Sequence, residues 1–327
     1  MKKEAKKLIS LTISLMLVLS ALCVVNVSAQ ADNTVTVTVE NKTFDGAPWT
    51  GELFTAEVEL QDTDSIESVL ERAITERNYA FSVTAYGYIA SVNGLEEYAV
   101  NGSGGWMASI NNWFTADGTG AYTVANGGLK AGDEIVLQYT CTWGADVGSL
   151  YGDYNTALST DFSVEGSNIA GYSFNAASTA DEGALYITAP DVLTIRASAV
   201  NKNYQTRFYL NGYNPSADGF RCGKNIPVKD GDTVYIGVGD PSWPSMNSWG
   251  GIAEESVYCF KVQQIMMGDI DGNGKVDVND VTELQRYLAE FITLDDAQLA
   301  AADADKDGLV TIKDATFIQR VVAEFDL

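Results

Sequence analysis

The sequence predicts a multidomain, mainly β protein made of a grasp-like α+β domain, a β-sandwich-like domain and a small all-α module. Three observations predict this class. Short segments with strand-type alternation fill most of the chain, one amphipathic helix pattern follows the first strand, and two acidic loops of one pattern start 34 positions apart near the C-terminal end. Behind an export segment at residues 1–29, we expect domains at residues 30–165, 166–265 and 266–327.

The N-terminal segment has the three parts of a secretory signal peptide. Four lysines in the first seven residues precede an apolar run from Leu8 to Val25, and Val27–Ala29 offers a small-residue cleavage site. A retained membrane anchor is the alternative, but three serines interrupt the apolar run. We therefore expect cleavage and a secreted, extracellular protein associated with a cell-surface complex.

Charge and composition exclude several classes of function. The chain carries 44 Asp and Glu against 20 Lys and Arg, a formal net charge of −24. Nucleic acids and anionic membranes require a basic face, so neither is an expected partner. Histidine is absent from the sequence, which excludes Ser-His-Asp hydrolases and His-ligated zinc sites. The acidity is typical of a solvated, secreted surface.

The first domain begins with a strand and a helix. Residues 34–40 alternate with period two, as a half-buried strand does. Residues 64–67 resemble a capping box, and the apolar face of the helix that follows comprises Ile66, Val69, Leu70, Ala73 and Ile74. Further strands are expected at residues 86–92, 105–110 and 134–142. This order predicts a small grasp-like α+β layer.

Three segments of this domain carry a family resemblance. The stretches Ile89–Gly94, Gly104–Asn111 and Leu129–Tyr139 resemble the transcobalamin C-terminal-like domains of secreted bacterial proteins, over about Thr34 to Trp143. The resemblance implies that a small, corrinoid-like ligand is one alternative function. The helical barrel that forms the second domain of the vitamin carriers is missing, which weakens that implication. Trp106 is expected in the core rather than at a ligand.

The second domain has an all-β pattern. Regular spacing of short strands and turn signals predicts a compact β-sandwich, with strands at residues 185–188, 192–197, 206–210, 233–238 and 257–262. Outside the cell Cys222 and Cys259 could form a disulfide, or each could be an unpaired buried thiol. Trp243 and Trp249, in a polar Gly/Pro-rich loop, are candidates for stacking on sugar rings; packing beneath the loop is the alternative.

The C-terminal loops fit a calcium-binding pattern. Calcium takes roughly six to eight oxygens, and a twelve-residue loop supplies them from positions 1, 3, 5, 7, 9 and 12, with glycine at position 6. Gly274 and Gly308 occupy that position. Two calcium ions are therefore expected, and their predicted ligands are Asp269, Asp271, Asn273, Lys275 through its carbonyl, Asp277, Asp280, Asp303, Asp305, Asp307, Leu309 through its carbonyl, Thr311 and Asp314.

Each loop precedes a helical pattern, at Val281–Phe291 and Ala315–Phe325, and the two copies share Gln-Arg and Ala-Glu-Phe. The first loop lacks an entering helix, and position 12 is Asp rather than the usual Glu of an EF-hand. Duplicated loops with exiting helices resemble the type I dockerin family, over Gly268 to Phe325. The resemblance implies an all-α dockerin that folds on calcium and binds a cohesin domain of a scaffolding or cell-surface protein, in a polysaccharide-degrading complex of cellulosome or amylosome type.

The resemblance also implies which residues choose the cohesin. They are loop positions 10 and 11 and the exposed helix face, which here are Val278, Asn279, Arg286, Ile312, Lys313 and Arg320. No acidic pair lies in a recognisable catalytic motif, so no catalytic residue is predicted. We expect a secreted, non-catalytic accessory subunit that presents its β-rich modules to glycans or surfaces. The alternatives are a glycoside-active enzyme of unrecognised family and the corrinoid-like binder.

Overall fold

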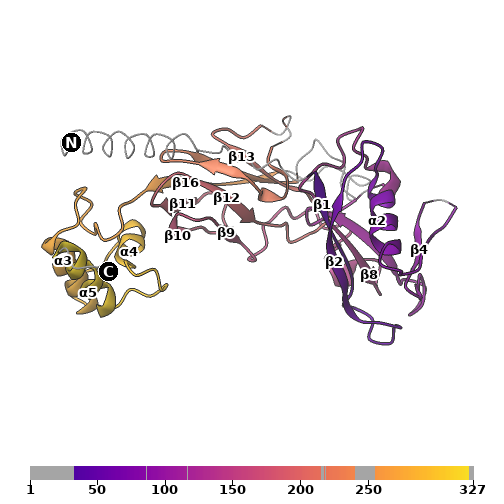
Figure 1. Ribbon diagram of the computed structural model, residues 1–327, viewed down its shortest axis with the longest axis horizontal. Coiled ribbons are helices and arrows are strands. Elements are labelled where there is room, and N and C mark those ends of the chain that lie inside the picture. The colour runs from indigo at the N-terminus through magenta and orange to yellow at the C-terminus, as the bar shows by residue number, and fades with distance from the viewer. Residues whose placement is uncertain are drawn as a thin grey trace, which may run out of the picture. The chain divides into compact units, whose positions relative to one another are not determined.

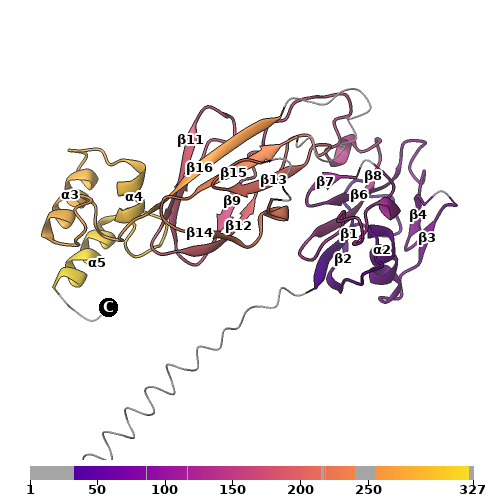
Figure 2. The same ribbon diagram turned by 90° about the horizontal axis from the view of Figure 1, so that it is seen from above.

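The computed structural model describes residues 33–85, 87–115, 117–214, 217, 219–239 and 255–323. The expected signal peptide and the glycan-binding candidates Trp243 and Trp249 lie outside the described residues. The described part of the chain is mainly β, with four short α-helices and sheets that do not close into barrels (Figures 1 and 2). None of those helices combines the length and apolar character that a membrane span requires.

The first domain is built on a five-stranded sheet. Its strands, in sheet order, are β2 (Gly51–Glu59), β1 (Thr34–Asn41), β8 (Glu134–Thr140), β6 (Gly105–Ile110) and β7 (Trp113–Phe114). The β1 and β8 strands pair in parallel, and the other neighbours are antiparallel. A small second sheet contains β3 (Phe81–Val83), β4 (Ile89–Val92) and β5 (Leu95–Glu96). Alternation in β1 turns its valines into the core and its threonines outward.

Helix α2 (Ile66–Thr75) lies between the five-stranded sheet and the β3–β4 hairpin (Figures 1 and 2). Ser65 caps it: its hydroxyl accepts from the Ser68 N–H at 3.2 Å, and the Ser68 hydroxyl accepts from the Ser65 N–H at 2.9 Å. All five apolar residues predicted to share a face are fully buried. The predicted helix and its core-facing side are confirmed.

The second domain has two sheets with a common core. One sheet has the strand order β10 (Ile169–Ser173), β11 (Glu182–Ile187), β16 (Ser256–Gln264), β15 (Thr233–Val238) and β13 (Thr206–Leu210). The other sheet has the strand order β14 (Ile226–Val228), β12 (Asp191–Arg196) and β9 (Ser163–Glu165). Their buried apolar residues form one cluster that begins at Leu158, ahead of the expected boundary at residue 166. The sandwich-like name and the domain boundaries remain predictions.

The three described cysteines, Cys141, Cys222 and Cys259, are free thiols. Of the two alternatives for Cys222 and Cys259, the structure has unpaired thiols, and the disulfide is not formed. The Cys222 thiol contacts the Gly132 carbonyl oxygen at 3.0 Å. Burial raises the pKa of this thiol to about 12, so at neutral pH it is protonated and behaves as a small packing group.

A buried ion pair links the turn before β8 to the short helix η3 (Arg221–Gly223). The Arg221 guanidinium donates to both carboxylate oxygens of Asp133 at 2.9 Å. It also donates to the carbonyls of Gly127 and Gly128 at 2.9 and 3.1 Å. Because Asp133 is fully buried, the bidentate geometry and the additional carbonyl acceptors are what make burial of both charges tolerable.

The C-terminal module consists of α3 (Val278–Leu288), α4 (Asp296–Ala302) and α5 (Ile312–Val322). Helices α3 and α5 pack against each other. Val281 and Leu284 of α3 are buried, as are Ala315 and Ile318 at the matching positions of α5. The predicted helices were placed three residues too late, because the capping residues at the loop ends already begin the helical turns.

Candidate functional site: two acidic loops and their helices

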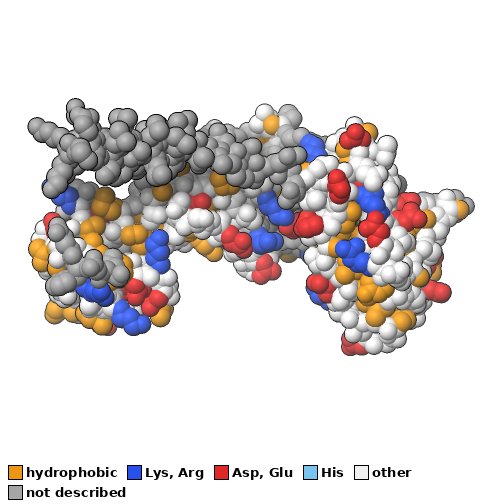
Figure 3. Space-filling model, in the orientation of Figure 1, with side chains coloured by type: hydrophobic (Ala, Val, Ile, Leu, Met, Phe, Trp, Pro, Cys, Tyr) orange, Lys and Arg blue, Asp and Glu red, His pale blue; other side chains and the backbone are white. Residues whose placement is uncertain are grey.

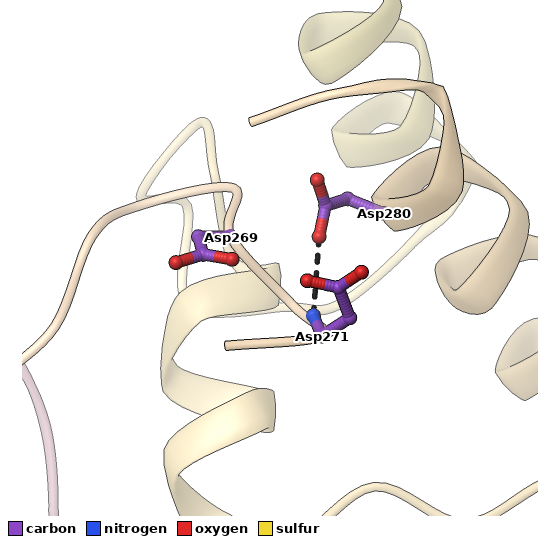
Figure 4. A group of neighbouring side chains, drawn as sticks. All are labelled: Asp269, Asp271 and Asp280. Atoms are coloured by element: carbon purple, nitrogen blue, oxygen red, sulfur yellow. Dashed lines mark hydrogen bonds between the residues drawn. The ribbon is translucent and has the colours of Figure 1, made fainter. Parts of the chain in front are cut away.

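The first loop brings three of its predicted ligands together. Carboxylate oxygens of Asp269, Asp271 and Asp280 lie within 4.8 Å of one another, and Figure 4 shows these side chains turned toward a common space. Asp269 and Asp271 come from the loop, and Asp280 comes from the first turn of α3. Three carboxylates this close repel one another in the absence of a cation, and hard oxygen ligands of this kind suit calcium.

Asp280 is fully buried and is held by backbone groups of the loop itself. One oxygen accepts from the N–H groups of Ile270 at 2.7 Å and Asp271 at 3.1 Å, and the other accepts from Asp277 at 2.7 Å. The carboxylate is thereby fixed at the end of the loop. A longer Glu side chain is not required to reach the loop, which gives a physical reason for Asp at position 12.

The other side of the first loop is ordered by Asp269. Its two oxygens accept from the N–H groups of Asn273 at 3.1 Å and Gly274 at 2.9 Å. Gly274 has φ +83°, and a Cβ built there would meet nothing within 4 Å. The glycine is needed for the left-handed backbone conformation and not for space.

The second loop repeats this arrangement. Oxygens of Asp303, Asp305 and Asp307 lie within 4.8 Å of one another, and Asp303 accepts from the N–H groups of Asp307 and Gly308 at 3.1 and 3.0 Å. Gly308 has φ +84°. Asp314, which the 4.8 Å cluster does not include, is fully buried. The sequence repeat is thus also a structural repeat.

Asp314 makes two of the three backbone contacts that Asp280 makes in the first loop; the N–H of Ala304, at the position of Ile270, donates to the Ala302 carbonyl instead. Its oxygens accept from the N–H groups of Asp305 at 3.2 Å and Thr311 at 2.8 Å. In the first loop Asp280 itself belongs to the converging cluster, whereas in the second loop Asp307 takes that place.

The position 9 residues have a second role that the sequence analysis missed. Asp277 and Thr311 are the N-caps of α3 and α5, and their side chains accept from the N–H groups of Asn279 at 2.7 Å and Lys313 at 3.2 Å. Among the described residues, the Asp277 carboxylate belongs to neither converging cluster. Contact with the ion through water is common at position 9 of such loops.

The remaining predicted ligands lie on the outside of the loops. Lys275 and Leu309 have exposed side chains, and calcium binding through their carbonyls stays a prediction. The Asn273 amide donates to Asp271 at 2.9 Å. The Lys313 ammonium lies 3.5 Å from Asp307, but this exposed pair contributes little to stability.

All six residues expected to choose the cohesin are exposed. Val278 and Ile312, which open α3 and α5, have 64% and 61% of their surface accessible to solvent. Single exposed apolar side chains are common on protein surfaces, but these two recur at equivalent positions of the repeat. Each is followed by a polar residue, and Arg286 and Arg320 lie farther along the same two helices.

Helix α4, directly ahead of the second loop, was not predicted. Asp295 caps it by accepting from the Gln298 N–H at 2.9 Å, and the Gln298 amide donates to the Ile270 carbonyl of the first loop at 3.0 Å. The capping pattern Asp295–Gln298 in the sequence was a signal that could have located this helix. The second loop therefore has both an entering and an exiting helix, and α4 connects it to the first.

Comparison with known families agrees with this geometry. Residues 267–323 match the family model described as Dockerin type I domain. This stretch is a type I dockerin domain. Dockerin domains bind calcium, dock onto cohesin domains and typically occur in secreted proteins, and the two aspartate clusters are compatible with calcium. The match includes no residue before 267, so it gives the transcobalamin-like resemblance no support. No curated protein matches the chain.

Proposed function

We propose that the chain is a secreted accessory subunit of a polysaccharide-degrading complex, anchored by its dockerin to a cohesin and presenting its β-rich domains to a glycan. The observation that carries this proposal is the duplicated unit of acidic loop, buried aspartate and exposed helix start. On the face shown in Figure 3, the described Lys and Arg side chains are interspersed with Asp and Glu and form no single patch. Such a surface suits a neutral partner better than a polyanion.

The proposal includes two calcium ions, one in each loop. Asp269, Asp271 and Asp280 supply carboxylates to the first ion, with Asn273 and the Lys275 carbonyl beside them and Asp277 acting through water. Asp303, Asp305, Asp307 and Asp314 surround the second, with the Leu309 carbonyl and Thr311. Because bound cations offset the repulsion within each cluster, calcium binding and folding of the dockerin are coupled.

The docking surface is proposed to have two similar halves. Val278, Asn279 and Arg286 form the first half, and Ile312, Lys313 and Arg320 form the second. Since α3 and α5 carry equivalent residues at equivalent positions, loss of one half is partly covered by the other.

Calcium and docking are tested on the mature chain with a panel of cohesins. Calorimetric titration should count two calcium ions, and chelator should abolish cohesin binding. Replacing the three residues of one half by alanine should weaken docking only partly, whereas replacing both halves should abolish it. Complete loss from a single-half variant that still holds calcium contradicts the two-sided surface, and docking that persists in chelator contradicts the calcium role.

The non-catalytic role is tested on insoluble polysaccharides. The chain is incubated with a panel of them, and retention and release of reducing sugar are measured in the same tubes. Retention without sugar release is the expected result. Sugar release by the purified chain would favour the glycoside-active alternative instead.

A further inference from the structure

Aromatic side chains from three separate segments line a hollow beside strand β6. Tyr88, Tyr98 and Trp143 are 40%, 54% and 70% exposed, and with Trp106 and Met107 they border a cavity of about 230 Å³. We infer that this hollow is a glycan-binding site that stacks neutral pyranose rings on Trp143, Tyr98 and Tyr88. The inference rests on the proposed glycan-presenting function and places it in the first domain.

The Tyr88 ring is fixed by the strand it faces. Its hydroxyl oxygen accepts from the Trp106 N–H at 3.0 Å. A Cβ on Gly105 would lie 2.2 Å from that oxygen, far inside contact distance, so only glycine at 105 admits the ring. The Tyr88 backbone is bonded in turn to Thr84, whose N–H donates to the Tyr88 carbonyl at 2.7 Å. A preorganised ring loses little conformational entropy when a ligand binds.

Trp143 and Tyr98 are held outward at a cost in backbone strain. Both residues have left-handed backbones, with φ +55° and +61°, a region that bulky side chains rarely occupy. Each is tied to the loop before β6, since Trp143 donates its N–H to the Ser103 carbonyl at 3.1 Å and Tyr98 donates to the Gly104 carbonyl at 2.9 Å. Residues whose surroundings enforce a strained backbone concentrate at functional sites. Both Trp143 and Tyr98 have such a backbone.

The chemistry of the lining selects an uncharged ligand. None of the nine lining residues is Asp, Glu, Lys, Arg or His, and their polar side-chain groups are hydroxyls and indole N–H groups. Aromatic faces carry partial negative charge and attract the C–H face of a pyranose ring, whereas hydroxyls pair with its polar edge. Anionic sugars and phosphates would find no cation in this lining, so a neutral polysaccharide fits best.

The size of the hollow limits the ligand further. A neighbouring cavity of about 280 Å³ shares Tyr88, Trp106 and Met107 and extends toward Thr119. Sites for drug-sized ligands enclose about 300–1,000 Å³, so each hollow suits about one ring and neither suits a corrinoid macrocycle. Two adjoining hollows that share Tyr88, Trp106 and Met107 fit successive rings of one oligosaccharide.

The test uses the mature chain in calcium and soluble hexasaccharides of cellulose, xylan, mannan and starch, with oligogalacturonate as the anionic comparison. Binding is measured by calorimetry and by quenching of tryptophan fluorescence. We expect at least one neutral oligosaccharide to bind, and Trp143→Ala or Tyr98→Ala to weaken its binding by about tenfold or more, the loss typical of one stacked ring. Gly105→Ala, which displaces Tyr88, should also weaken binding.

Tyr151→Ala and Tyr154→Ala are the matched controls, because these tyrosines are 70% and 47% exposed but do not line the hollow. Both should bind as the parent does, and melting temperatures verify that every variant is folded. Parent-like binding by folded Trp143→Ala and Tyr98→Ala overturns this site while leaving glycan binding in place. A parent that docks on cohesin but binds no oligosaccharide, or only oligogalacturonate, overturns the site together with the neutral-glycan role.

Discussion

Replacing Asp280 with alanine removes an acceptor shared by three backbone N–H groups of the first calcium loop. The Ile270 N–H belongs to a fully buried residue, so leaving it unpaired costs about 1–3 kcal/mol. The N–H groups of exposed Asp271 and half-buried Asp277 regain water, and we assign them about 0.5–1.5 kcal/mol each. The three terms add to an expected loss in dockerin stability of about 2–6 kcal/mol, apart from any loss of calcium affinity.

Hydrogen exchange followed by mass spectrometry measures this loss within the full chain, because peptides from residues 267–323 report local opening separately from the other domains. In saturating calcium, a loss of at least about 2 kcal/mol corresponds to exchange faster by about thirtyfold or more. Asp280→Asn keeps the bonds from Ile270 and Asp271 through its amide oxygen but loses the carboxylate charge and the bond from the Asp277 N–H. Asp296→Asn, in the first turn of α4 and outside the loops, is the control. Parent-like exchange in Asp280→Ala would refute the reasoning.

Three further predictions concern the other domains. The pKa of Asp64 is lowered by its hydrogen bonds from Arg72. The ionised carboxylate therefore stabilises the fold fully above the unfolded pKa of about 3.9, and this stabilisation is lost as pH falls through the lower folded pKa. Asp64→Asn should lower the melting temperature at pH 7, and the difference from the parent should shrink below about pH 4. Trp106→Ala removes a side chain that is 2% exposed and should lower the free energy of unfolding by about 3–5 kcal/mol. Calorimetry would detect this loss in the unfolding transition of the first domain, and a parent-like transition would place Trp106 outside the core. Cys222, with its pKa raised to about 12, should resist iodoacetamide at pH 8 in the folded chain and react in denaturant, as peptide mass spectrometry can verify; rapid labelling of the native protein would be the contrary result.

Sequence patterns located the elements whose periodicity was undisturbed. Strands β6, β13 and β15 have the predicted bounds, because apolar runs flanked by turn residues define them locally. Strand β2 was missed, since its glutamates and scattered apolar residues show no clean alternation and its pairing with β1 includes a bulge. Strands β9 and β14 are three residues long and are defined by their pairing with β12. Because β12 is distant from both in the sequence, local patterns do not reveal them.

The candidate site was predictable to different degrees in its two parts. Loop positions alone identified every aspartate of the two clusters, because spacing within twelve residues determines which side chains meet. The aromatic hollow was not predicted, since Tyr88, Tyr98 and Trp143 lie in different segments and meet only after β6 and β8 pair. Trp106 was placed correctly in the core, and its indole N–H donates to the Leu95 carbonyl at 3.1 Å.

Under the proposed function, the aspartates that close the two loops would couple ion binding to partner recognition through the backbone. Asp280 and Asp314 are the third residues of α3 and α5, and Asp277 and Thr311 are the caps. The two residues between cap and aspartate in each copy, Val278–Asn279 and Ile312–Lys313, are four of the six residues expected to meet the cohesin. A displacement of either buried carboxylate therefore re-aims those side chains through a single turn of backbone, with no hinge or intervening element to absorb it.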